Sequence, residues 1–296
     1  MTILVLGRQG QLAQCLQASG REDLVFFGRP ETDLRDPASL QRVLAETQPH
    51  AVINAAAYTN VDKAETDQGE CYAINHEGPA ALASLCAAHG IPLLHVSTDC
   101  VFDGRQTQPY EPGDTPNPIS VYGHSKLAGE LAVREANSRH LIVRVSWVFS
   151  GFAGNFVRTM LSLAMTKHEV AVVDDQFGYP TYGPDLASAL LTMIDAAALP
   201  GFSAWGTYHF AGSTDVDRAS LAEAVFAESR SLGGPTALVR RVPTQEYPTP
   251  AKRPLNARLS SASAEETFGV VRSDWRTGLR RCVPGLLHRL RVDEVS

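Results

Sequence analysis

Short apolar runs alternate with longer amphipathic stretches over the first half of the 296-residue chain. The apolar runs are rich in leucine and β-branched residues, which is typical of buried strands. The stretches between them place apolar residues at helical spacing. Strands are predicted at 2–6, 24–27, 51–54, 92–97 and 141–145, and helices at 11–19, 37–46, 78–89 and 122–136. This alternation predicts an α/β fold, a Rossmann-type doubly wound parallel sheet with right-handed crossovers.

The alternation changes after about residue 150, which indicates a second unit. Helices are predicted at 155–167 and 185–197, and strands at 170–173 and 208–210. We expect the helix at 185–197 and the strand at 208–210 to return to the first sheet. The predicted division is therefore a cofactor domain at 1–148 and 182–213, and a smaller α/β substrate-binding domain at 149–181 and 214–296.

Composition narrows the classes of protein that fit. Hydrophobic residues make up 44% and charged residues 20% of the chain, as in compact globular proteins, and the net charge is −6. We therefore expect no general attraction to nucleic acid or to an anionic membrane. The basic C-terminal stretch alternates with apolar residues such as Trp275 and Leu279, which indicates a packed amphipathic end rather than a nucleic-acid-binding arm.

The cysteines indicate the compartment. Their number is five, which is odd, and no two of them have the Cys-x-x-Cys spacing. They lie mostly in apolar stretches and are expected to be reduced core residues in a reducing compartment. No run of about 18 apolar residues occurs, so the sequence predicts a cytoplasmic protein without a membrane partner.

A glycine-rich turn lies between the first predicted strand and the first predicted helix. Gly7 and Gly10 permit a tight turn there, and Ala13 takes the last position of the motif. Backbone N–H groups at such a helix start bind a pyrophosphate. Glycine is also common in ordinary turns, so the position of the motif, more than its pattern, favours dinucleotide binding.

The end of the second predicted strand bears on the choice of cofactor. A carboxylate usually stands there in proteins that bind NAD, whereas this chain has Phe27, Gly28 and Arg29. Arg29 favours NADPH, because an arginine accommodates the 2′-phosphate, although the same residue fits a solvated loop. Glu31 and Asp33 lie close to it, so NADH stays the alternative.

Tyr122 and Lys126 stand four residues apart in a predicted helix and therefore share one face. A phenol acts as an acid or base near neutral pH only when its anion is stabilised, and an ammonium one turn away supplies that stabilisation. Thr98 follows the fourth strand at the same sheet edge. We interpret Thr98, Tyr122 and Lys126 as a catalytic set rather than a surface pair with an unrelated hydroxyl.

With these motifs the sequence resembles the extended short-chain dehydrogenase/reductases, and more narrowly the dTDP-4-dehydrorhamnose reductase family. The resemblance covers nearly the whole chain, and its last three segments fall in the predicted substrate-binding half. The matching segments are GRQGQL at 7–12, NAAAYTNVDKAE at 54–65, the asparagine of AIN at 73–75, STDCVFDG at 97–104, PISVYGHSKLAGE at 118–130, RVSWVF at 144–149, DQFGYPT at 175–181, YHFAG at 208–212 and RPLNARL at 253–259.

The resemblance implies roles for particular residues. Tyr122 would be the proton donor, Lys126 would bind the nicotinamide ribose and lower the tyrosine pKa, and Thr98 would bond the substrate oxygen. Asp99 and Trp147 would contact the deoxysugar nucleotide, with a core aromatic as the alternative for Trp147. The implied cofactor-binding residues are Gly10, Gln11 and Leu12 at the pyrophosphate, Asp33 and Leu34 near the adenine, and Ala57, Tyr58 and Thr59 along the cofactor cleft.

One position departs from the family pattern. The family usually has S-T-D-Y-V-F where this chain has Cys100 in place of the tyrosine. This change leaves the sugar specificity and the pH optimum open, and an inert buried thiol is the favoured interpretation over a reactive one. His89, His95 and His124 do not share a metal-ligand spacing with cysteines or carboxylates, so we expect no metal, although the resemblance implies that some family members use magnesium at a dimer contact.

The resemblance implies NAD(P)H-dependent reduction of the C4 ketone of a dTDP-6-deoxy-4-keto sugar, dTDP-4-dehydro-L-rhamnose. Two alternatives remain. One is another nucleotide-sugar 4-ketoreductase or an epimerase on the same scaffold, which Cys100 favours. The other is a non-catalytic NADP-binding regulatory subunit that resembles the methionine adenosyltransferase β subunit. The sequence leaves the oligomeric state open between a homodimer and a monomer.

Overall fold

The computed structural model describes residues 2–293, and a six-stranded sheet lies at its centre. Its order is β10-β5-β4-β3-β1-β2, and every neighbouring pair is parallel. The Rossmann-type prediction is therefore confirmed, and the strand expected to return to the sheet does so as β10. The strands are β1 (Ile3–Leu6), β2 (Leu24–Phe27), β3 (Ala51–Asn54), β4 (Leu93–Thr98), β5 (His140–Val145) and β10 (Gly206–Phe210).

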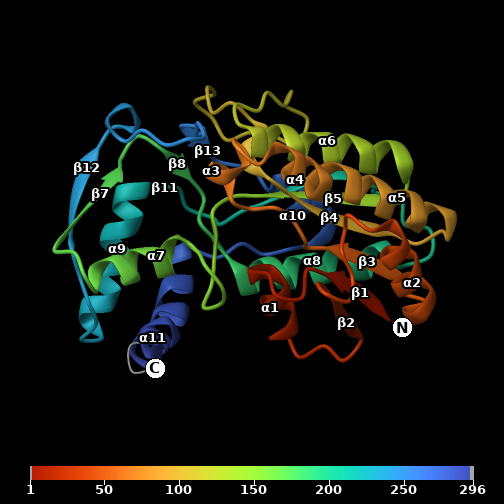
Figure 1. Ribbon diagram of the computed structural model, residues 1–296, viewed down its shortest axis with the longest axis horizontal. Helices are drawn as coiled ribbons and strands as arrows, with labels where there is room; N and C mark the ends of the chain where they lie inside the picture. Colours follow the sequence, from red (N-terminus) through yellow and green to blue (C-terminus); the bar gives the residue numbers. More distant parts are fainter. Residues whose placement is uncertain (1, 294–296) are drawn as a thin grey trace.

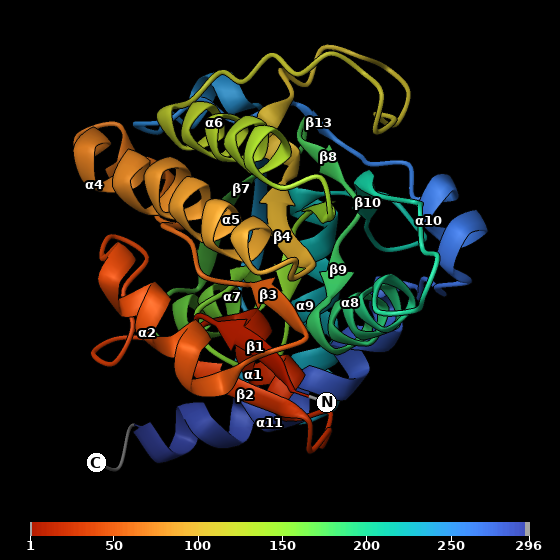
Figure 2. The same ribbon diagram turned by 90° about the vertical axis from the view of Figure 1, so that its right-hand side faces the viewer.

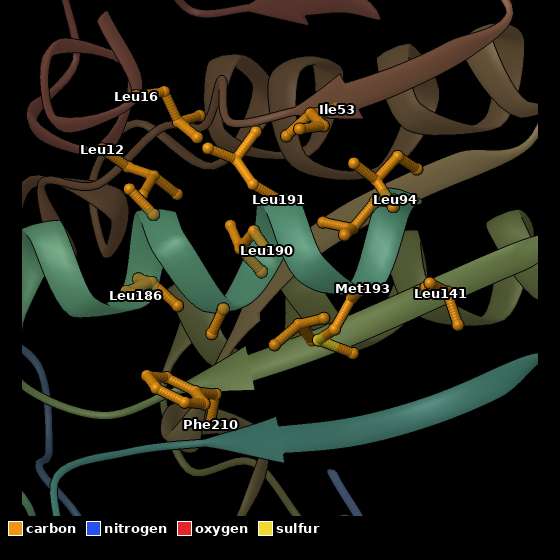
Figure 3. Close-up of a cluster of buried hydrophobic side chains, with 14 of the residues drawn as sticks. Leu12, Leu16, Ile53, Leu94, Leu141, Leu186, Leu190, Leu191, Met193 and Phe210 are labelled. Atoms are coloured by element: carbon orange, nitrogen blue, oxygen red, sulfur yellow. The ribbon is translucent and has the colours of Figure 1, made fainter. Parts of the chain in front are cut away.

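Helices cover both faces of this sheet. Figure 2 shows α5 and α6 on one side of it and α8 on the other. Leucines and Met193 of α8 fill the space between α1 and the strands, as Figure 3 shows. The helices of the two layers are α1 (Gln11–Gln17) and α8 (Gly183–Ala197) on one face, and α2 (Pro37–Thr47), α5 (Gly78–Ala88) and α6 (Val121–Ala136) on the other.

A second group of elements lies beside the sheet, at the left of Figure 1. Its helices pack around a separate apolar cluster that includes Val225 and Trp275, and two of its strands form a parallel pair. The basic C-terminal stretch is thus packed through α11, as predicted. The elements are α7 (Phe156–Ala164), β7 (Glu169–Val173), α9 (Arg218–Ser231), β12 (Leu238–Val242) and α11 (Trp275–Asp293).

Short elements join the two groups. Three two-residue strands make a small sheet of order β11-β8-β13, and β6 pairs with β9. The helix α10 packs on β10 and α8, so it joins the core of the larger sheet. These elements are β6 (Val148–Phe149), β8 (Phe177–Gly178), β9 (Thr181–Tyr182), β11 (Val216–Asp217), β13 (Asn256–Ala257), α10 (Ala262–Phe268) and the 3₁₀ turn η3 (Thr244–Glu246).

A helical segment between β3 and α5 packs against α6. It comprises α3 (Val61–Ala64), α4 (Gln68–Tyr72) and the π-helical turn η1 (Ala73–Glu77). The buried amide of Asn75 accepts from Tyr58 N at 2.9 Å and donates to Tyr58 O at 3.1 Å. Asn75 therefore fixes the loop that follows β3.

The described part of the chain contains no helix that is both long and apolar enough to cross a membrane.

Candidate active site

The crevice at the carboxyl ends of β1 and β3 is the topological switch point of the sheet. The chain leaves β1 for β2 on one side and returns to β3 on the other. Gly7 follows β1 with φ of +102°, and a Cβ at Gly7 would lie 2.9 Å from Ala56 N. Only glycine lets the turn after β1 approach the loop after β3 this closely.

The start of α1 faces this crevice and fits a dinucleotide pyrophosphate. Gly10 is the N-cap of α1 and has no side chain to cover the first N–H groups of the helix. The first turn of α1 contains no acidic residue that would repel an anion. These features form the anion cradle that the sequence predicts, and the fit supports a dinucleotide site.

A cleft of about 880 Å³ extends from this turn across the sheet edge to the second group of elements. The predicted cofactor-binding residues line it with one exception. Tyr58 lies outside the lining, because Asn75 holds its backbone and its phenol donates to Asp67 at 3.2 Å. The residues that do line the cleft are Gly7, Gly10, Gln11, Leu12, Arg29, Asp33, Leu34, Ala57 and Thr59.

Charges of both signs surround the β2 end of the cleft. Arg8 and Arg29 line it, and the Arg8 guanidinium lies 3.0 Å from a Glu31 carboxylate oxygen. Arg35 donates to the Asp33 carboxylate and lowers the pKa of Asp33. Asp33 and Arg8 are therefore each engaged by a partner of opposite charge, and Arg29 also lies on the wall.

The first turn of α6 brings Tyr122 against the end of β4. Ser120 caps the helix by accepting from Gly123 N at 3.2 Å. A Cβ at Gly123 would lie 2.2 Å from Cys100 O, so glycine is required where α6 packs on the 3₁₀ turn η2 (Asp99–Val101). This close approach brings Tyr122 to the end of β4, where Thr98 acts on the pKa of its phenol.

Burial acts in opposite senses on the two titratable groups of the predicted set. Burial raises the pKa of Tyr122 well above its ordinary value, against the effect of the Thr98 hydrogen bond. Burial lowers the pKa of Lys126 to about 8, and the Lys126 amine donates to Val96 O at 2.8 Å. The tyrosine therefore keeps its proton near neutral pH, whereas the lysine titrates close to it.

Asp99 lies on the next part of the cleft wall and is buried. Its carboxylate accepts from the Thr98 hydroxyl at 2.8 Å and from the Ser146 hydroxyl at 3.4 Å. Burial raises the pKa of Asp99 above its ordinary range. The Thr98 oxygen also accepts from Cys100 N at 3.1 Å, so both hydrogen-bonding roles of that hydroxyl are used.

The far wall of the cleft comes from the second group of elements. Trp147 follows β5 with φ of +45°, a strained conformation for a residue with a side chain. The guanidinium carbon of Arg218, at the start of α9, lies 3.6 Å from the Trp147 ring centroid. Burial lowers the pKa of Arg218 to about 10, which leaves it charged at neutral pH. Trp147 is thus a cleft residue, rather than a core aromatic alone.

Sequence reasoning gave no role to three residues on this wall, namely Arg218, Arg253 and Gln176. Arg253 lies in the matching segment RPLNARL and pairs with Asp62 of α3 at 2.9 Å. Asp62 also accepts from Ala251 N, so α3 holds this loop against the cleft. Arg218 lies outside the segments that match the family, and only the folding of α9 onto Trp147 brings it to the site.

Cys100 lines the cleft and is half-buried beside Tyr122. Burial and the neighbouring Asp99 raise the pKa of the Cys100 thiol to about 12, so it stays protonated near neutral pH. Within residues 2–293, no group of three or more histidine, cysteine and carboxylate side chains is arranged to hold a metal ion.

A doubly wound parallel sheet, a glycine turn at its switch point and a tyrosine–lysine pair on the adjoining helix together define a dinucleotide-dependent oxidoreductase of the extended short-chain type.

Comparisons with known proteins identify the family. The model of the family described as RmlD substrate binding domain matches residues 1–287. A dTDP-4-dehydrorhamnose reductase of Sinorhizobium fredii is 42% identical over 291 residues, which cover 97% of this chain and 98% of that relative. The chain therefore belongs to the RmlD family, which includes dTDP-4-dehydrorhamnose reductases.

Two solved structures are similar over nearly their whole length. A dTDP-4-dehydrorhamnose reductase of Clostridium acetobutylicum superposes with a TM-score of 0.89 at 33% identity, over 96% of this chain and 99% of that one. The same enzyme of Bacillus anthracis, in complex with NADP, gives a TM-score of 0.87 at 32% identity, over 95% and 98%.

Proposed function

We propose that this protein reduces the C4 ketone of dTDP-4-dehydro-L-rhamnose (dTDP-6-deoxy-L-lyxo-4-hexulose) to dTDP-L-rhamnose with NADPH, the last step of dTDP-rhamnose biosynthesis. The observation that carries the proposal is the place of Tyr122. Its phenol lies on one continuous cleft, between the glycine turn at Gly7 and the wall at Trp147 and Arg218. The names of the full-length relatives support the choice of substrate.

NADPH, when bound, supplies the hydride to the ketone carbon. Gly10, Gln11 and Leu12 would hold its pyrophosphate at the start of α1, and Lys126 would hold the nicotinamide ribose hydroxyls. The NADP in the Bacillus anthracis relative and the arginines at positions 8 and 29 support NADPH over NADH.

Tyr122 gives its proton to the substrate oxygen as negative charge develops there. The high pKa of the buried phenol keeps that proton available at neutral pH. The Lys126 ammonium, one helix turn away, stabilises the phenolate that is left. Thr98 exchanges its bond to Asp99 for one to the substrate oxygen, which orients the ketone.

Asp99 and Trp147 contact the deoxysugar nucleotide on the far side of the ketone. Arg218 and Arg253 lie on the same wall, and we infer that they bind the diphosphate of the substrate. Arg218 is stacked on Trp147, and the nearby Asp99 carboxylate favours its charged form without a direct salt bridge among the described residues. An anionic ligand would satisfy this charge.

The larger organisation follows from the same proposal. Residues 1–148 and 182–213 bind the cofactor, and 149–181 and 214–296 bind the nucleotide sugar. The separate apolar clusters of the two groups of elements support this division, except that α10, which lies within 214–296, packs in the cluster of the cofactor side. We place the reaction in the cytoplasm, and the five free cysteines support a reducing compartment. We propose a homodimer, and sedimentation equilibrium tests it by the mass of the particle.

The test of the function is a coupled assay of NADPH and NADH oxidation. The keto-sugar is made in situ from dTDP-glucose by a dehydratase and an epimerase, and each is omitted in turn as a control. We expect oxidation that requires the epimerase. Oxidation with a different nucleotide sugar only would replace the proposed substrate. NADP binding without oxidation of any keto-sugar would indicate the regulatory subunit instead.

A further inference from the structure

Three buried polar side chains form a row of contacts that ends at Lys126 of the catalytic pair. Asn54 at the end of β3, His95 in β4 and Lys126 in α6 are 1%, 0% and 2% exposed. Asn54 Nδ2 lies 3.1 Å from His95 Nδ1, and His95 Nε2 lies 3.4 Å from Lys126 Nζ. Because Asn54 and His95 are register partners in the parallel sheet, the contact between them is set by the fold.

The backbone fixes which way the Asn54 amide points. Ala56 N donates to Asn54 Oδ1 at 3.2 Å, so the amide NH₂ is the group that faces His95. An NH₂ group can only donate, and His95 Nδ1 must therefore accept. Burial and the Lys126 charge lower the pKa of His95 well below its ordinary value, so the ring is neutral and its one proton lies on Nε2.

That proton points at the lysine. An ammonium has no lone pair, so a charged Lys126 would place an N–H donor against the Nε2–H donor, at a side chain that is only 2% exposed. A neutral amine, in contrast, can accept the Nε2–H and still donate to Val96 O. Reversing the imidazole tautomer only moves the conflict, because Nδ1–H would then face the Asn54 NH₂.

The other groups near Lys126 do not cancel this effect. Glu130, one turn further along α6, favours the ammonium, but its carboxylate is bound by Arg144 at 2.7 Å and by Ser97. Tyr122 on α6 is neutral near pH 7, and burial raises the pKa of Cys71 on α4. His95 is therefore the nearest polar group that acts against the charge of Lys126.

We propose that His95, held by Asn54 as the Nε2–H tautomer, is a positioning residue that opposes protonation of Lys126 and so sets the pH at which the catalytic pair loses its ammonium. The protonation effect is a property of the resting protein. Its consequence for turnover rests on the proposed function.

The tautomer is tested first, in the unmodified protein. In ¹⁵N-histidine-labelled protein, the ring nitrogen shifts distinguish a protonated Nε2 from a protonated Nδ1, and the His95→Leu variant identifies the signals of His95. We expect a neutral ring with the proton on Nε2 across neutral pH. A proton on Nδ1 would overturn the proposal without any functional assay.

The effect on the lysine is tested by titration. The chain has four lysines, Lys63, Lys126, Lys167 and Lys252, so ¹³Cε signals resolve readily and Lys126→Met identifies the one of interest. We expect His95→Leu to raise the Lys126 midpoint by about one pH unit, the scale of one removed buried donor conflict. If His95 instead accepted from the ammonium, the same substitution would lower the midpoint.

His209 provides the matched control, because it is a buried histidine whose Nε2 faces Arg144 rather than Lys126. His209→Leu should leave the Lys126 midpoint unchanged. If His95→Leu leaves that midpoint unchanged or lowers it, the proposal is contradicted. Where keto-sugar reduction is measured, the alkaline limb of kcat/KM should follow the NMR midpoint. An inactive protein with the expected titration would overturn the proposed function and leave this inference standing.

Discussion

Tyr122 and Lys126 show how one buried position can prepare two groups for one proton transfer. Burial raises the pKa of the Tyr122 phenol and lowers the pKa of the Lys126 amine. The Lys126 ammonium, one helix turn away, favours the phenolate, so the tyrosine can release its proton when the substrate oxygen gains charge. The pair thus suits proton donation to a ketone better than proton abstraction.

The first prediction concerns Tyr122→Phe. Because the substitution removes the proton donor and keeps the ring, kcat should fall by about 10²-fold or more, in the range of general acid catalysis. Affinity for NADP, measured by fluorescence titration, should change little. The exposed Tyr247 is the control, and Tyr247→Phe should keep wild-type turnover. Unchanged turnover in the Tyr122 variant would remove this residue from the mechanism.

A second residue-scale prediction concerns Arg218→Met. Loss of a charge-assisted hydrogen bond to the diphosphate should raise KM for the nucleotide sugar about tenfold or more. The affinity for NADPH should stay unchanged, because Arg218 lies on the Trp147 side of the cleft. Arg230→Met, at an exposed position of the same helix α9, is the matched control. Equal KM values in the two variants would contradict the role of Arg218.

At the scale of elements, a buried ion pair joins α6 to the sheet. Arg144 in β5 and Glu130 in α6 are 2.7 Å apart and almost fully buried, and Ser97 in β4 donates to the same carboxylate. Arg144 also lies over the Phe102 ring. This network orients the helix that carries Tyr122 and Lys126.

Removing one partner of that network should be costly. Arg144→Met leaves the Glu130 carboxylate buried and unpaired, and the free energy of unfolding should fall by about 3–5 kcal/mol. The comparison is Arg240→Met, which breaks the exposed Arg240–Glu169 pair and should change stability by about 0.5 kcal/mol at most. Urea unfolding measures both. A loss at Arg144 no larger than that at Arg240 would show that the pair does not hold α6.

Sequence patterns predicted well several strands of the central sheet and the long helices that cover it. The strands β2 and β3 occupy the predicted residues, and the bounds of α5 and α6 differ from prediction by one residue at an end. Among the elements that the pattern did not predict are η1 and the two-residue strands β8, β11 and β13, together with the longer α9 and β12. A π turn held by Asn75 and strands that exist only through distant partners leave no periodic signal in the chain.

The same limit applies to the site. Thr98, Tyr122 and Lys126 lie at fixed positions after β4 and in α6, so spacing and a family resemblance could place them. Arg218 is brought to Trp147 only by the packing of α9, and nothing in its local sequence marks it. Tyr58 shows the converse, because its segment matches the family while its side chain turns to Asp67.

At the scale of the whole molecule, buried neutral histidines link stability to pH. Burial lowers the pKa of His209 from 6.5 to about 3, and that of His95 also falls well below 6.5. The stability that these two neutral histidines contribute is fully present above pH 6.5. As pH falls from 6.5 toward 3, the unfolded chain takes up protons that the folded protein does not, so stability decreases.

His209 should lower the free energy of unfolding by about 1.7 kcal/mol between pH 6.5 and 5, and the neutral His95 acts in the same direction. Urea unfolding at the two pH values measures the loss. His209→Gln should lose less stability over this interval than the wild type, whatever its stability at pH 7. Equal losses in the two proteins would mean that His209 is not held neutral in the fold.

The most direct test of the central claim follows the hydrogen atoms. Wild-type protein and Tyr122→Phe are given dTDP-4-dehydro-L-rhamnose and NADPH deuterated at the nicotinamide C4, and the products are examined by NMR. The proposed mechanism predicts dTDP-L-rhamnose with deuterium at C4 of the sugar from the wild type, and a rate lower by about 10²-fold from the variant. Deuterium elsewhere in the sugar, a product of other configuration at C4, or an equally fast variant would contradict it.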